Sequence, residues 1–116
     1  MLARSPLIQN LEKARNLIVD KDRWCEGGLR DELGRHCAIG AYNEVAGTQG
    51  YREVPDALVK AAVNMVDEAG LNRWDAGFGF HAVYMVNDQL GHEATLRMFE
   101  RAIEIAIQEG VSEYAS

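Results

Sequence analysis

Apolar side chains recur at helical spacing in three stretches of the chain, each bounded by residues that start or end helices. The first, residues 5–20, opens with the N-cap Ser5 followed by a proline. The others are residues 55–70 and 92–109, and Gly110 is expected to end the last helix and leave the residues after it frayed. The three apolar stripes are Leu7, Leu11, Ala14, Leu17 and Ile18; Leu58, Ala62, Met65, Val66 and Ala69; and Leu96, Phe99, Ala102, Ile103 and Ala106.

The segments between these helices have other patterns. Residues 24–35 contain three glycines, which predicts an irregular loop or a small β-hairpin at about residues 27–36. Residues 36–46 predict a short buried helix ended by glycine, and residues 71–80 a loop whose aromatic rings pack inward. Residues 81–86 are too short for periodicity to separate strand from helix, although their β-branched content slightly favours strand.

Together these segments predict a mainly α protein, a compact single domain over residues 1–116 with about four helices and a possible hairpin. A chain of 116 residues has the usual length of one domain and can bury one core. Hydrophobic residues make up 47% and charged residues 26%, both ordinary values for a globular protein.

The charge of the chain argues against a nucleic-acid partner. Eighteen acidic and twelve basic residues give a net charge of −6, which repels a phosphate backbone. No apolar run approaches the ~20 residues of a membrane helix. Charges at Glu12, Lys13 and Arg15 interrupt the stretch where a signal peptide would be apolar. We therefore expect a soluble, cytoplasmic protein with neither a nucleic-acid nor a membrane partner.

Several short motifs follow one another in an order that resembles a known family. They are Trp24 with Gly27, the turn residue Gly34, the Cys37–Ala41 segment and the Asn87-Asp88 pair. In order and spacing they resemble a family of small bacterial proteins, the domain of unknown function 6197. The family pattern often has tryptophan before the Asn-Asp pair, whereas this chain has Val86. The resemblance implies a compact domain and carries no activity.

Cys37 is the first candidate for chemistry. It stands where a helix begins, and the helix dipole and free amides there favour the thiolate. With His81 as base and Asn87 or Asp88 as the orienting group, it would form a small cysteine-dependent hydrolase or transferase. The alternative is a small, inert side chain at a close-packed helix face. Likewise, the Asn-Asp pair could instead bond backbone amides and fix the approach of the last helix.

A metal-binding module is the third alternative. Cysteine and histidine are present in sufficient number, but no C-x-x-C, H-x-x-x-H or H-E-x-x-H spacing occurs, so we predict no metal and no cofactor. The available ligands are Cys25, His36, Cys37, His81 and His92.

The leading hypothesis is a non-enzymatic binding or interaction domain. It rests on the absence of a specific catalytic spacing and on the wide apolar stripes of the long helices. The expected partner is a second copy of this chain, giving a homodimer, or another protein.

Overall fold

The computed structural model describes residues 5–50, 53–71 and 79–115, with side chains through residue 110. This part of the chain is helical and contains no strand, which confirms the predicted mainly α fold. Its elements are α1 (Pro6–Leu17), the 3₁₀ turn η1 (Lys21–Arg23), α2 (Ala38–Ala46), α3 (Asp56–Glu68), α5 (Phe80–Met85), the π-helical turn η2 (Val86–Leu90) and α6 (His92–Ala115).

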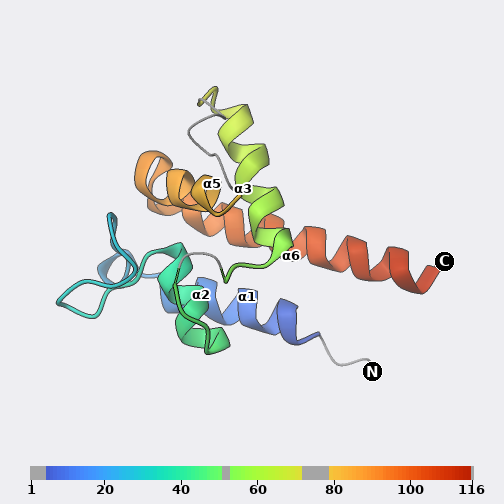
Figure 1. The fold of residues 1–116 in the computed structure, drawn as a ribbon, viewed down its shortest axis with the longest axis horizontal. Coiled ribbons are helices and arrows are strands. Elements are labelled where there is room, and N and C mark those ends of the chain that lie inside the picture. Colours follow the sequence, from blue (N-terminus) through green and yellow to red (C-terminus); the bar gives the residue numbers. More distant parts are fainter. Residues whose placement is uncertain (1–4, 51–52, 72–78, 116) are drawn as a thin grey trace.

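The long helix α6 is central to the fold, and both α1 and α3 pack against it (Figure 1). α1 and α6 run in opposite directions, so both described chain ends lie at the same end of the molecule. The core takes in much of the apolar stripes that the sequence predicts, and α2, α5 and η2 add further side chains to it. Its largest fully buried apolar side chains are Leu11, Ile18, Ile39, Leu58, Val66, Val83, Val86, Met98 and Phe99.

Helix α2 ends as predicted and begins at Ala38, two residues after the predicted start. The Cys37 sulfur caps its first turn by accepting a hydrogen bond from the Gly40 amide at 3.4 Å. Gly47 ends it in the left-handed region, with φ of 74°. The backbone of Leu29, which lies in the 24–35 loop, packs closely against Gly40 of this helix. A Cβ on Gly40 would lie only 1.9 Å from the Leu29 carbonyl oxygen, so the helix accepts this loop only with glycine there.

The hairpin expected at about residues 27–36 does not form among the described residues. Two isolated bridges join His36 to Trp24 and to Arg30, and the rest of the segment is irregular. Instead of the regular hydrogen bonds of a hairpin, the His36 backbone makes two bonds to the start of the segment. Its amide donates to the Arg23 carbonyl at 2.9 Å, and its carbonyl accepts from the Cys25 amide at 3.0 Å. The irregular-loop interpretation is therefore correct.

Several elements differ in type or length from the sequence prediction. Residues 80–85, where the sequence left strand and helix open, are helical, because Ala82, Val83 and the following Val86 all face the core at helical spacing. Helix α6 passes through Gly110 and continues to Ala115, while α1 ends earlier than expected, at Leu17. Residues 72–78, which hold most of the predicted aromatic loop, lie outside the described residues.

Within the described part of the chain, no helix has the length and apolar character that crossing a membrane requires.

Candidate functional site

Asn87 is the most heavily bonded side chain of the predicted site. It is 1% exposed, and its oxygen accepts hydrogen bonds from the Trp24 indole at 2.7 Å and the Ala38 amide at 3.0 Å. Its nitrogen donates to the Cys25 carbonyl at 3.0 Å and to the Asp88 carboxylate at 2.9 Å. All four hydrogen-bonding positions of the amide are therefore filled.

Asp88 extends this arrangement. Its Oδ1 accepts from the Gly27 amide at 3.1 Å as well as from Asn87. We call the bonds that Asn87 and Asp88 make to residues 24–38 the Asn87 clamp. The two side chains do bond backbone amides, but these belong to the 24–38 loop and the first turn of α2. Neither side chain caps α6 directly, and the expectation that they fix the approach of the last helix stays a prediction.

The Cys37 thiol is buried, at 4% exposure, and lies one residue from the clamp. Burial raises its pKa from 9.0 to about 11, against the smaller opposing effect of hydrogen bonds from the Gly40 and Ile39 amides. A nucleophilic cysteine requires the opposite direction. Burial also raises the pKa of Cys25, whose thiol donates to the Arg35 carbonyl at 3.4 Å, and the two cysteines are not bonded to each other.

His81 lies on the exposed face of α5, and its ring contacts that of Phe80 with centroids 4.3 Å apart. The structure thus brings Asn87 and Asp88 next to Ala38, the residue that follows Cys37. It exposes His81, however, and buries the Cys37 thiol. The described residues contain no group of three or more His, Cys, Asp or Glu side chains placed to hold a metal ion.

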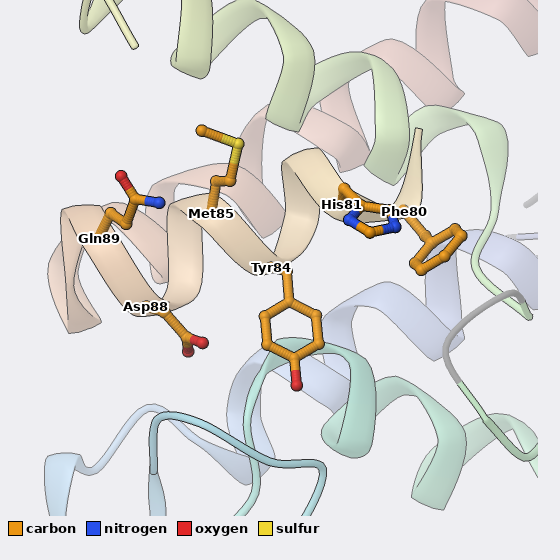
Figure 2. Close-up of a pocket in the computed structure, with 6 residues that line it drawn as sticks. All are labelled: Phe80, His81, Tyr84, Met85, Asp88 and Gln89. Atoms are coloured by element: carbon orange, nitrogen blue, oxygen red, sulfur yellow. The ribbon is translucent and has the colours of Figure 1, made fainter. Parts of the chain in front are cut away.

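Two rows of side chains line a shallow depression of about 440 Å³ along α5 and η2 (Figure 2). Within each row the residues are four apart, so they stack along one side of the helix. Figure 2 shows Tyr84 and Asp88 projecting on one side and Met85 and Gln89 on the other. The rows are Phe80, Tyr84 and Asp88, and His81, Met85 and Gln89. We call the space between them the α5 groove.

The family comparison agrees with the sequence resemblance. A model of the family of unknown function, DUF6197, matches residues 3–105. The chain belongs to this family. No curated protein and no solved structure matches the chain significantly.

In this DUF6197 domain, several of the residues that carried the resemblance meet in space. Trp24, Gly27 and Ala38 all bond directly to the Asn87-Asp88 pair. They come from positions 49 to 63 residues away in the sequence. The clamp therefore explains these motif residues by their part in holding the fold together.

Sequence reasoning missed Phe80, Tyr84, Met85 and Gln89 of the DUF6197 domain as site residues. Their signal is the spacing of four residues, which becomes visible only once residues 80–90 are taken as helical. The slight preference for a strand would have sent successive residues to opposite faces and hidden the rows.

Proposed function

We propose that this chain is a non-enzymatic interaction domain that docks a helical segment of another protein in the α5 groove. The observation that carries the proposal is the pair of rows spaced by four residues. Helices pack by placing the side-chain ridge of one into the groove between ridges of the other. A groove with Tyr84 and Met85 at its centre and polar residues at its end has the composition of such a docking surface.

The clamp supports this proposal because it makes the surface rigid. η2 carries two groove residues, Asp88 and Gln89, and the Asn87 side chain directly before them is fixed by four hydrogen bonds. π-helical turns are rare and are frequently found at functional sites. A surface that is already ordered loses less conformational entropy when a partner binds.

The cysteine-dependent alternative, with Cys37, His81 and Asn87 or Asp88, receives less support. The Cys37 thiol is buried with a raised pKa, and the oxygen of Asn87 already accepts from two protein donors. This alternative stays a prediction, and the reactivity of the thiol tests it.

A homodimer also stays a prediction. The large apolar side chains exposed in the described part of the chain are Val19, Leu33 and Ile107, each on a different segment. Light scattering over a range of protein concentrations measures the oligomeric state directly, and a strict monomer would leave another protein as the partner.

Selection from a displayed library of amphipathic helical peptides tests the docking surface. Peptides selected on the full chain should lose binding when Tyr84→Ala removes the central ring. They should also lose it with Gln89→Lys, which alters an exposed end of the groove without touching the core. Leu33→Ala is the matched control, since Leu33 is apolar, 79% exposed and outside the groove. Selection of no helical binder, or of binders that tolerate both groove variants, would refute the proposal.

A further inference from the structure

Asp88 stands out among the groove residues because only one of its carboxylate oxygens is used. In the part of the chain that the structure describes, both of its hydrogen bonds end on Oδ1. Asp88 also lines the α5 groove, at the end opposite Phe80 and His81. Its second oxygen, Oδ2, is therefore available to a group that enters the groove.

The carboxylate is held in place from two directions. The Gly27 amide approaches it from the loop, and the Asn87 side-chain nitrogen approaches from η2 itself. Since Asn87 is buried and fully bonded, Asp88 cannot rotate away without breaking bonds of the clamp. A fixed carboxylate is a stronger recognition element than a mobile one, because less side-chain entropy is lost on pairing.

The surroundings of Asp88 favour a cation. None of the six groove residues is lysine or arginine. Tyr84 lies four residues before Asp88 on the same side of the helix (Figure 2), so its ring borders the path to the carboxylate. A cation placed there can pair with Oδ2 and lie against the aromatic ring. The net charge of −6 adds a long-range attraction for basic partners.

We infer that the helix docked in the α5 groove is basic, with a Lys or Arg side chain that pairs with Oδ2 of Asp88. This inference rests on the proposed docking function and names the chemistry of the partner. The partner's apolar row lies between Tyr84 and Met85, and the cation stands at the η2 end of that row. The carboxylate thereby fixes both the direction and the register of the bound helix.

The same peptide selection tests this inference when it is repeated with Asp88→Asn. Wild-type protein should select helices with Lys or Arg at one fixed spacing from the apolar row. Asp88→Asn should weaken a selected peptide by roughly tenfold or more. Glu104→Gln is the matched control, because it removes the same charge from an exposed position on α6 and should leave the affinity unchanged.

A change in the peptide provides a second measurement on the unaltered protein. Replacing its Lys or Arg by norleucine should weaken binding to the wild type by a similar factor, and should have little further effect on Asp88→Asn. Groove binders that show no basic preference, or that bind Asp88→Asn and Glu104→Gln equally well, would overturn the basic partner and leave the docking proposal intact. Binders indifferent to Tyr84→Ala and Gln89→Lys would overturn both.

Discussion

The side-chain amide of the buried residue Asn87 bonds three groups of the segment 24–38. Truncation by Asn87→Ala removes the acceptor of the Trp24 indole and the Ala38 amide and the donor to the Cys25 carbonyl. Because these groups are buried, we expect a loss of about 3 to 5 kcal/mol in the free energy of unfolding, measured by urea denaturation. Gln89→Ala, two residues away and exposed, should change it by less than about 0.5 kcal/mol. Similar losses in both variants would contradict the clamp.

Cys37 gives the domain a distinctive response to alkaline pH. Its folded pKa of about 11 lies above the value of 9.0 for an unperturbed thiol. Between these values the unfolded chain has released the proton and the folded chain has kept it, so stability falls as the pH rises. The contribution is fully present below pH 9 and is lost as the pH approaches 11, by up to about 3 kcal/mol.

Cys37→Ser isolates this contribution, since a hydroxyl retains an acceptor at the N-cap and does not titrate in that range. Urea denaturation between pH 8 and 10.5 should show a shallower loss of stability for Cys37→Ser than for the wild type, while Cys25 and Tyr42 act equally in both. Parallel profiles would contradict the buried thiol. Rapid alkylation of native Cys37 by iodoacetamide below pH 8 would favour the enzymatic alternative.

At the scale of single elements, α2 and α6 each contain a glycine in a helix but differ in what surrounds it. Gly40→Ala would place a methyl group 1.9 Å from the Leu29 carbonyl oxygen, so we expect a loss of about 2 kcal/mol or more despite the better helix propensity of alanine. A Cβ on Gly110 would have no described atom within 4 Å, and Gly110→Ala should raise the free energy of unfolding by about 0.5 to 1 kcal/mol. Thermal and urea unfolding of the two variants measure both changes in stability. Changes of the same sign would contradict the close approach of the Leu29 backbone to Gly40.

Most helices could be predicted from the sequence because each apolar stripe lies between residues that typically start or end a helix. Ser5 does cap α1, accepting from the Ile8 amide at 3.2 Å, and Gly47 does end α2. The end of α6 was predicted too early, since a single glycine lowers helix propensity by only about 1 kcal/mol and does not by itself end a helix. For residues 81–86 the sequence left strand and helix open, and contacts with the core favour the helix over a weak local preference for strand.

The candidate site was less predictable than the fold. Asn87 and Asp88 were singled out correctly as side chains that bond amides, but their partners lie 49 to 63 residues away, and no local pattern encodes such a pairing. The rows of the α5 groove depend on a helix that the sequence left undecided. Cys37 was predicted correctly to lie at the start of a helix, whereas its raised pKa follows from burial in the folded chain.

For the molecule as a whole, the clamp makes the irregular loop part of the cooperative unit. The Cys25 and His36 amides bond within the loop segment, and the Ala38 amide bonds to Asn87. We expect these amides to exchange with solvent about as slowly as that of Phe99 in α6. In Asn87→Ala they should exchange more than roughly tenfold faster relative to Phe99. Fast exchange at the three amides in the wild type would show that the loop opens independently of the helices.

The sequence separation of the clamp also bears on how the domain folds. A bond across 61 to 63 residues requires a large loop to close, and its entropy cost must be met before the bond contributes. Contacts of this kind form late, after local helices and their first packing contacts. Stopped-flow measurements on Asn87→Ala should therefore show faster unfolding with a nearly unchanged refolding rate. The clamp would then act mainly on the lifetime of the native state, setting how long the groove persists between unfolding events.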